Sequence, residues 1–505
     1  MANKIYFTVF IWLFCFFNAN AQVWPKYYGQ QNCREYARKI IETYDNGYLI
    51  LGEFFNTSYS KRWAWIIKTD INGNILWEKI FENSQSYTNL GSVLQSNDGG
   101  YFFCGTVAAL NGVNLPVVVK LNACGEKEWC KIFGRNPNTL PYIQDIKETE
   151  SGDIVLLVNQ FGSIPQETIH LFKLNAEGEV IWKKAYATMY NYPNTNTKLG
   201  ESLLITKNGK YLISGGGYWE QPWNPGGPMP LTSLFIMSDS DGNEEWVLPF
   251  GLKDTIIGKT KQTMNITDDV FLGTGFNWPN TDLIEPCYMV FNSAGYELNY
   301  TIIKPDSINS LLLEGTFEIS QLINTSVFST GNFALKNGQR ETIVDCILNF
   351  NMNTMELNPL NNLICFNGRY PYTNTKSFDN KLLSNSSYYR SSTDYDIFLA
   401  KLNLNLEYDT AYTIPITYDS LCTSGAPQSG FIYLNDCPID MDLPGDSNCD
   451  AIVSLNDIVS SVAKILGGIP QPFCPQNADA NGDGVLNVVD VVETANIIVG
   501  RIGRY

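Results

Sequence analysis

The sequence predicts an all-β fold made of repeated four-stranded sheets, followed by a small all-α region at the C-terminal end. The 505-residue chain is 13% aromatic and 17% charged and contains 40 glycines, a composition typical of β-sheet proteins with many tight turns. A unit of about 50–60 residues recurs through most of the chain, which is the mark of a repeat architecture. A shorter repeat with helical periodicity follows it near the C-terminus.

The N-terminal 21 residues have the pattern of a secretory signal peptide. Lys4 precedes the apolar run Ile5–Phe17, and Ala19–Ala21 has the small-residue pattern of a cleavage site. The apolar run is too short to span a bilayer, and no later segment is long enough to do so. We therefore expect cleavage before Gln22 and a secreted, extracellular protein with no transmembrane segment.

The charge balance argues against a nucleic-acid partner. The chain has 51 acidic and 34 basic residues and a formal net charge of −17. Binding to nucleic-acid phosphates requires clustered Lys and Arg side chains. The excess of carboxylates fits cation binding better.

Each long repeat between residues 22 and 420 contains two predicted β-hairpins. The first is seen in ETYDNGYLILGEF (42–54) and LQSNDGGYFFCGTV (94–107), where a Gly, Asn or Asp turn joins two strands. The second has a Gly in its turn and a Trp four residues later. These pairs are Gly73 and Trp77, Gly125 and Trp129, Gly178 and Trp182, and Gly242 and Trp246.

Seven copies of the repeat are recognisable, although the last three are degenerate and Asn299 stands at the Trp position of one of them. Four antiparallel strands repeated in this way are the signature of a β-propeller, here with seven blades, in which the sheets pack face to face around a ring. We expect the repeated tryptophans to pack between neighbouring blades. The repeats resemble those of secreted propellers in exported bacterial proteins, and this resemblance implies a fold more than an activity.

The start of the mature chain is expected to close the ring. Residues 23–29, VWPKYYG, match the last strand of a repeat such as EWCKIFG, but no other strand of a repeat precedes them. A single strand of this kind can complete the last blade and remove an open sheet edge. We predict that residues 23–29 pair near residues 397–413.

The long loops of the predicted propeller gather on one face, which makes that face the candidate binding site. They span residues 56–65, 186–197, 215–230 and 275–287. Four aromatic side chains in or beside these loops can stack on sugar rings, or alternatively pack within the loops themselves. These candidate ligand-binding residues are Tyr218, Trp219, Trp223 and Trp278.

The sequence identifies no catalytic residue. The mature chain has one histidine, His170, in a predicted strand, so a histidine-rich zinc site is excluded and the histidine is interpreted as structural. A pair of catalytic carboxylates remains open, but nothing in the sequence selects one. Asp45, Asp70, Asp98 and Asp241 lie in turns, where Asp supplies local hydrogen bonds.

Beyond an irregular linker predicted at 421–443, two segments repeat each other at an offset of 33 residues, as from Asp446 to Asp479. Each contains a loop of about twelve residues with oxygen-bearing side chains at positions 1, 3, 5, 9 and 12, and a position-7 carbonyl, the pattern that surrounds Ca²⁺. The predicted ligands are Asp446, Asn448, Asp450, Ile452, Ser454 and Asp457 in the first loop, and Asp479, Asn481, Asp483, Val485, Asn487 and Asp490 in the second.

The two predicted calcium sites differ at position 6, where the loop needs a sharp turn. Gly484 supplies that turn in the second loop, whereas Ala451 replaces it in the first, so we expect the second site to bind more tightly. A helix follows each loop, with an apolar stripe that is expected to pack against its counterpart across a pseudo-twofold axis. The stripes comprise Leu455, Ile458, Val459, Val462, Ile465 and Leu466, and Val488, Val491, Val492, Ala495, Ile498 and Val499.

The duplicated loop and helix, with Asp at position 12, resemble a type I dockerin over residues 444–505. The resemblance implies two Ca²⁺ ions and docking to a cohesin-like protein on a scaffold or cell surface, often within polysaccharide degradation. Cys449 and Cys474 resemble a cysteine pair of some secreted dockerins, which implies a disulfide. The residues at positions 10 and 11 depart from the usual small polar pair of the family; they are Leu455 and Asn456, and Val488 and Val489.

Together these features predict an exported, non-catalytic binding protein whose β-propeller is attached to a partner by a calcium-dependent dockerin module. Two alternatives remain. The first is a carbohydrate-active hydrolase or lyase with its site on the loop face of the propeller, and the second is a cell-surface adhesion protein.

Overall fold

The computed structural model describes most of the chain from Trp24 to Val499. Within that range it does not describe residues 31–32, 56–60, 84–86, 109–113, 135–138, 163–167, 187–197, 219–230, 251–257, 278–284, 304–313, 338–339, 355, 358–362, 367, 392–393, 417–421, 423–428, 442–443, 449–452 and 482–484. The predicted signal peptide, 1–21, therefore lies outside the described residues. In the part that is described, no helix has the length and apolarity needed to cross a membrane.

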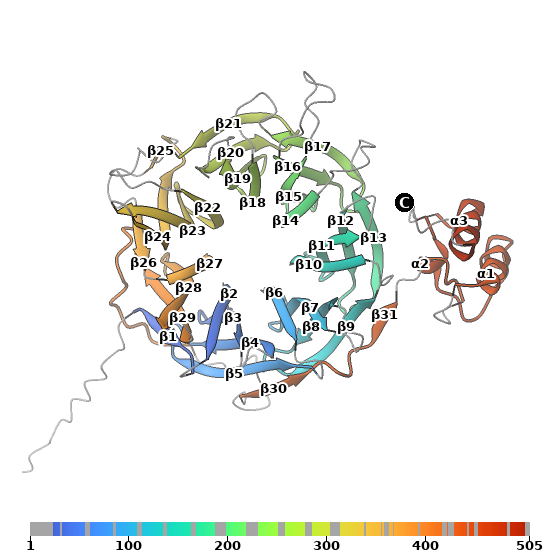
Figure 1. Ribbon diagram of the computed structural model, residues 1–505, viewed down its shortest axis with the longest axis horizontal. Coiled ribbons are helices and arrows are strands. Elements are labelled where there is room, and N and C mark those ends of the chain that lie inside the picture. The colour runs from blue at the N-terminus through green and yellow to red at the C-terminus, as the bar shows by residue number, and fades with distance from the viewer. Residues whose placement is uncertain are drawn as a thin grey trace, which may run out of the picture.

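Antiparallel sheets stand around a central opening in the arrangement of a β-propeller (Figure 1). Three of these sheets have four strands each, joined in sequence order. They are β10 (Thr139–Glu148), β11 (Ile154–Gly162), β12 (Thr168–Leu174) and β13 (Val180–Tyr186); β14 (Lys198–Ile205), β15 (Tyr211–Tyr218), β16 (Leu231–Ser238) and β17 (Glu244–Phe250); and β18 (Gly258–Asn265), β19 (Val270–Asn277), β20 (Glu285–Asn292) and β21 (Glu297–Ile302).

Two sheets have five strands. In the first, a distant strand, β31, adds to the outer edge. The members are β6 (Thr88–Gln95), β7 (Tyr101–Ala108), β8 (Asn114–Leu121), β9 (Lys127–Gly134) and β31 (Ile439–Met441); and β22 (Glu314–Ile323), β23 (Ser326–Asn337), β24 (Arg340–Asn351), β25 (Glu356–Leu357) and β26 (Leu363–Phe366).

The sixth sheet has nine strands and joins the two ends of the repeat region. Its members are β27 (Gly368–Lys376), β28 (Leu382–Ser391), β29 (Asp394–Leu402), β1 (Lys26–Tyr28), β2 (Arg34–Glu42), β3 (Tyr48–Phe55), β4 (Arg62–Thr69), β5 (Ile75–Glu82) and β30 (Gly430–Tyr433).

The prediction of a seven-bladed propeller made of separate four-stranded sheets is wrong. In the described residues the strands form six hydrogen-bonded sheets and no closed barrel. There are six sheets rather than seven because β29 is hydrogen-bonded to the strands at the start of the chain. Lys26–Tyr28 pair antiparallel with Ile397–Leu399, and Arg34 of β2 pairs parallel with Tyr395. The first and last repeats are thereby merged into one sheet. The predicted pairing of the start of the chain with the 397–413 region is confirmed for residues 26–28, which pair with residues 397–399.

The repeated tryptophans pack each sheet against the next, as predicted. A Cβ atom built on Gly125 would lie 2.9 Å from the indole of Trp77, and one on Gly178 would lie 2.8 Å from that of Trp129. The glycines therefore provide flat surfaces on which the indoles rest. The same relation joins Trp24 to Gly73, Trp182 to Gly242 and Trp246 to Gly295.

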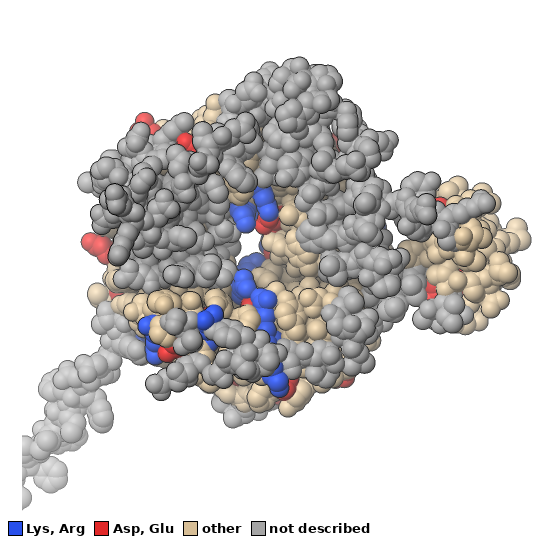
Figure 2. Space-filling view, in the orientation of Figure 1, with Lys and Arg blue, Asp and Glu red and all other residues tan. Residues whose placement is uncertain are grey.

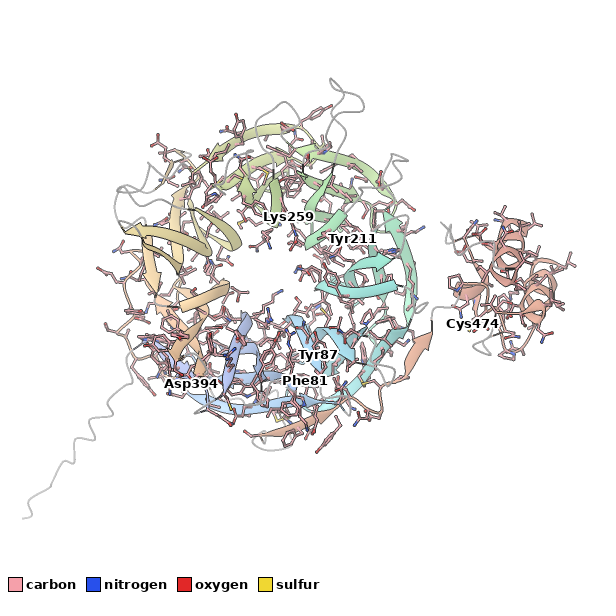
Figure 3. All side chains as sticks on the ribbon, in the orientation of Figure 1. Phe81, Tyr87, Tyr211, Lys259, Asp394 and Cys474 are labelled. Atoms are coloured by element: carbon pink, nitrogen blue, oxygen red, sulfur yellow. A yellow bond between two sulfur atoms is a disulfide. The ribbon has the colours of Figure 1, made fainter. Side chains whose placement is uncertain are left out.

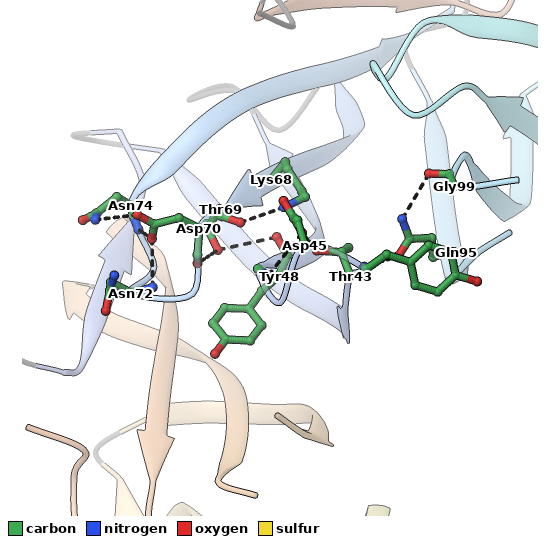
Figure 4. A network of polar contacts seen from close by, with 12 residues as sticks. Thr43, Asp45, Tyr48, Lys68, Thr69, Asp70, Asn72, Asn74, Gln95 and Gly99 are labelled. Carbon is green, nitrogen blue, oxygen red and sulfur yellow. Dashed lines mark hydrogen bonds and ion pairs between the residues drawn. The ribbon is translucent and has the colours of Figure 1, made fainter. Parts of the chain in front are cut away.

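A buried ion pair ties the first turn of a repeat to its third strand (Figure 4). Lys68 is fully buried, and its Nζ lies 2.7 Å from Asp45 Oδ2 and 2.9 Å from the Thr69 carbonyl oxygen. Burial lowers the pKa of Lys68, and the Asp45 carboxylate opposes that change. Equivalent pairs join Lys120 to Asp98 and Lys401 to Asp379. The turn aspartates Asp45, Asp70 and Asp98 accept backbone N–H bonds, as expected.

The segment expected to be an irregular linker contains two strands that bind the ring. β30 and β31 pair parallel with β5 and β9, the outer strands of two neighbouring sheets. Ile432 and Leu434 are buried in the same apolar cluster as Phe81. Two disulfides, Cys124–Cys422 and Cys130–Cys437, fasten the segment covalently. We call residues 422–441 the strap.

The C-terminal region has three helices: α1 (Leu455–Ile465), α2 (Pro475–Ala478) and α3 (Val488–Ile498). α1 and α3 pack against each other, but the expectation that their apolar stripes meet is wrong. The buried positions are small or acidic, namely Asp457, Ser460 and Ser461 in α1 and Asp490 and Thr494 in α3. The stripes remain largely exposed. Asp457 and Asp490 accept hydrogen bonds from the loops, and they hold the opposite face of each helix toward the interior.

Candidate functional sites

The described part of the second predicted calcium loop is organised around the carboxylate of Asp490. Its Oδ1 accepts a hydrogen bond from the backbone N–H of Asn481 at 3.2 Å, and its Oδ2 accepts one from the N–H of Asn487 at 2.8 Å. Asn487 Oδ1 in turn caps α3 by accepting the N–H of Val489 at 2.8 Å. Loop positions 3, 9 and 12 are thus drawn together by one side chain.

The first loop repeats this arrangement atom for atom. Asp457 Oδ1 accepts the N–H of Asn448 at 3.0 Å, Asp457 Oδ2 accepts the N–H of Ser454 at 2.8 Å, and Ser454 Oγ caps α1. The segments that precede the two loops are also joined, since the Gly445 N–H donates to the carbonyl of Asn477, in α2, at 2.7 Å. The repeat seen in the sequence is therefore a repeat in structure.

The chemistry of these loops suits a hard cation. Asp457 and Asp490 have no exposed surface and Asp446 is 2% exposed, while no Lys or Arg in the described residues forms an ion pair with Asp457 or Asp490. A buried carboxylate without a cationic partner is costly, and a divalent cation offsets that cost. Of the other predicted ligands, Asn448, Ser454, Asp479, Asn481, Val485 and Asn487 are described, whereas Asp450, Ile452 and Asp483 lie outside the described residues.

The proposed disulfide of this region is described on one side only. Cys474 is disulfide-bonded. Its expected partner, Cys449, lies outside the described residues. The Cys474 backbone N–H also donates to the Ser447 carbonyl at 2.9 Å, so the connector before α2 is hydrogen-bonded to the first loop.

Most of the predicted aromatic site falls outside the described residues. Trp219, Trp223 and Trp278 are not described, and Tyr218 is placed only as the last residue of β15, opposite Leu231. His170 is buried in β12, with its ring centroid 6.2 Å from that of Phe172, which agrees with its structural interpretation.

Sequence reasoning missed a polar cavity of about 820 Å³ at the ring centre. Its walls come mainly from the innermost strands, β2, β6, β10, β14, β18, β22 and β27, with Gly105 and Thr106 of β7 added. Each of these strands has a β-bulge at the equivalent place, and a bulge re-aims the extra residue. The bulged residues are Arg38, Gly91, Gln144, Glu201, Lys261, Glu318 and Tyr372; the first five line the cavity, and the side chains of the last two lie outside the described part of the structure.

One wall of the cavity carries a network around Asp145. Lys147 Nζ lies 2.8 Å from its Oδ2, and Lys39 Nζ lies 3.3 Å from its Oδ1. The same carboxylate accepts bonds from Ser92 Oγ at 3.0 Å and from the Leu203 N–H at 3.1 Å. Burial alone would raise the pKa of Asp145, but the two ammonium groups and these hydrogen bonds hold it well below its usual range.

A second polar group lies on β14 and β18. Glu201 forms ion pairs with Lys259 and, at 3.9 Å, with Lys261, and accepts a bond from Gln144 Nε2 at 3.4 Å. Figure 3 shows Lys259 directed toward the central opening. In the space-filling view, Lys and Arg side chains gather around this opening (Figure 2).

Comparisons with known proteins add little beyond these observations. The chain matches no protein-family model and no curated protein sequence. Among solved structures it is similar to a protein of unknown function from Dyadobacter fermentans (11% identity, 63% of this chain and 96% of that one, TM-score 0.40). It is also similar to the β-propeller domain of the trilobed protease from Pyrococcus furiosus (11%, 74% and 97%, 0.42) and to an ulvan lyase (9%, 74% and 88%, 0.39). Likenesses this distant carry no functional argument.

Proposed function

We propose that this is an exported, non-catalytic docking protein whose C-terminal region binds two Ca²⁺ ions and attaches the β-propeller to a cohesin-like partner. The observation that carries the proposal is the matched pair of loops, in which Asp457 and Asp490 close equivalent turns through equivalent bonds. Turns that are merely rich in aspartate have no reason to repeat such a pattern at an offset of 33 residues.

Calcium would be held by the loop oxygens predicted from the sequence, with Asp457 and Asp490 closing the two sites. Ca²⁺ takes six to eight oxygen ligands, so its binding neutralises several carboxylates at once. The loops precede α1 and α3, and their position-9 and position-12 residues also cap those helices. Binding is therefore coupled to the order of both helices.

The exposed stripes supply a surface for the partner. Leu455 and Val459 of α1 are 69% and 67% exposed, and their counterparts 33 residues later, Val488 and Val492 of α3, are 67% and 56% exposed. Contiguous exposed apolar side chains on a small domain are typical of a protein-binding surface. The occupant we propose is a cohesin-like module with an apolar face.

The strap explains how the docking region is carried. Two parallel strand pairings and two disulfides bind residues 422–441 to the outer edges of the ring. A load applied to the C-terminal region therefore reaches the ring through covalent bonds, and the hydrogen bonds between β1 and β29 that join the ring are spared.

The enzymatic alternative gains no support from the cavity acids. Asp145 and Glu201 are each bonded to two lysines. The lysines beside Asp145 keep its carboxyl ionised, whereas a general acid has to hold a proton near the working pH. An electrostatic role fits these acids better.

Surface plasmon resonance against a panel of type I cohesin modules tests the docking proposal. Binding is expected in Ca²⁺ and lost in a chelator. The double variant Val459→Asp/Val492→Asp should weaken binding by about 1,000-fold, because two hot-spot residues worth about 2 kcal/mol each sum to about 4 kcal/mol, without changing calcium uptake. Ile181→Asp, at a half-exposed position on the ring, is the matched control. Failure of the calcium-loaded chain to bind any cohesin of the panel, or an equal loss in the control, would contradict the proposal.

A further inference from the structure

We propose that the central cavity binds an acidic oligosaccharide, that is, a hydroxyl-rich ligand bearing a carboxylate or sulfate group. This proposal does not depend on the C-terminal docking function. It stands on the charge, the organisation and the polarity of the cavity walls.

The charge of the cavity is opposite to that of the whole chain. Among the described residues, four cationic ones line it, Arg38, Lys39, Lys147 and Lys261, against two acids, Asp145 and Glu201. The chain as a whole has a net charge of −17. A concave site that is lined by charges of one sign and has walls of low dielectric constant concentrates ions of the opposite charge. Figure 2 shows this basic rim facing the viewer at the central opening.

The cationic groups are held in place before any ligand arrives. Asp145 fixes Lys39 and Lys147, and it is itself fixed by backbone N–H groups of Ile146 and Leu203 at 2.9 and 3.1 Å. Burial lowers the pKa of Lys147, with Lys39 adding to the effect and Asp145 opposing it. An anion next to Lys147 would stabilise its charged form. Preorganised cations of this kind cost little entropy on binding.

The remaining lining selects a hydrophilic ligand. Amides and hydroxyls lie beside the lysines in the wall, together with aliphatic residues such as Ile41 and Leu204, and Tyr142 is the one aromatic residue among the described lining. Lipid chains would leave these polar groups unpaired, whereas sugar hydroxyls pair with them. A volume of about 820 Å³ lies within the range of small-ligand sites. The polar side chains of the lining include those of Asn89, Thr106, Gln144, Gln262, Gln321 and Thr375.

Gly91 offers a variant that changes the charge of the cavity without disturbing its walls. It lies at the bulge of β6, it lines the cavity, and a Cβ atom built on it meets no heavy atom within 4 Å. Gly91→Glu adds a negative charge there, and Gly91→Gln adds a side chain of the same size without the charge. Both variants should fold, so a difference between them reports electrostatics alone.

Isothermal titration calorimetry on the full mature chain in chelator tests the proposal apart from the calcium module. The probes are trigalacturonate, a sulfated trisaccharide, neutral cellotriose and inorganic phosphate. We expect one or both acidic sugars to bind, and to bind Gly91→Glu about tenfold or more weakly than Gly91→Gln, an electrostatic effect that falls with added salt. Lys261→Gln should weaken binding similarly, and the exposed Lys207→Gln should not.

Three results would overturn the inference: no binding of either acidic sugar at millimolar concentration, equal binding of cellotriose, or equal affinities of Gly91→Glu and Gly91→Gln. Binding of phosphate as tightly as the acidic sugars would overturn the oligosaccharide assignment. Loss of calcium binding or of cohesin binding leaves the outcome unaffected, so failure of the docking proposal is distinguishable.

Discussion

Replacing Gly125 by alanine should destabilise the ring through two separable effects. Gly125 has φ +72°, a left-handed backbone conformation that costs a residue with a Cβ atom about 1–2 kcal/mol. The new Cβ would also lie 2.9 Å from Trp77, closer than real Cβ contacts allow. Forcing the indole to move in a packed interior costs about 1–3 kcal/mol more. The expected total loss is about 2–5 kcal/mol.

Gly209 isolates the packing effect. Its φ is +74°, almost the same as that of Gly125, but a Cβ built there has no heavy atom within 4 Å. Gly209→Ala should therefore show the backbone cost alone, about 1–2 kcal/mol. The assay is urea unfolding of both variants, followed by tryptophan fluorescence and compared at the midpoint. Equal losses in the two variants would refute the claim that the indole of Trp77 rests on Gly125.

Three further variants follow from the ion pairs and the strap. Lys68→Met leaves the Asp45 carboxylate buried and unpaired, which should cost about 3–5 kcal/mol of stability. The double variant Lys68→Met/Asp45→Asn should recover part of that loss in a thermal melt, and no recovery would argue against a stabilising Lys68–Asp45 ion pair. Asp145→Asn should lower stability at neutral pH by about 2–4 kcal/mol. Because the folded-state pKa of Asp145 is depressed, its contribution to the free energy of unfolding is present above its ordinary pKa of about 3.9 and is lost as the pH falls below that value. A difference in unfolding free energy between wild type and variant that stays constant as the pH is lowered would contradict this. Cys124→Ser/Cys422→Ser should cost about 2–5 kcal/mol and expose the strap to limited proteolysis, whereas unchanged resistance would show that the strands hold the strap unaided.

The features that could be predicted from the sequence are local ones. The Gly turns and the tryptophans four residues later mark hairpins, and the structure packs those tryptophans on the glycines of the next sheet. The capping boxes at Ser454 and Asn487 are equally local, because the capping residue and its partner are three positions apart. Interactions between residues this close in the sequence can be predicted from the order of the residues.

The features that could not be predicted depend on pairing between distant segments. The single pairing of Arg34 with Tyr395 merges two repeats into one sheet, and no periodicity reveals it. The strap strands β30 and β31 are short and irregular in pattern, and their positions are set by Cys422, Cys437 and the edges they join. Eleven cysteines in the mature chain allowed too many pairings to choose from.

The sequence also did not show which face of each helix is buried or which strand residues point into the cavity. The apolar stripes that include Val459 in α1 and Val492 in α3 predict two amphipathic helices, but they do not show which face of each helix is buried. The small side chains of Ser461 and Thr494 let α1 and α3 pack with the aspartates inward. In the ring, a one-residue bulge turns Arg38 or Lys261 into the cavity, and a shift of that size leaves no trace in a strand pattern.

Calcium titration of the full mature chain by calorimetry shows whether the two loops bind Ca²⁺. We expect two bound Ca²⁺ per chain, with the loss of one site in Asp457→Asn, the loss of the other in Asp490→Asn, and unchanged uptake in the ring variant Asp98→Asn. Absence of calcium uptake at micromolar concentrations, or uptake that survives the double variant Asp457→Asn/Asp490→Asn, would contradict this expectation.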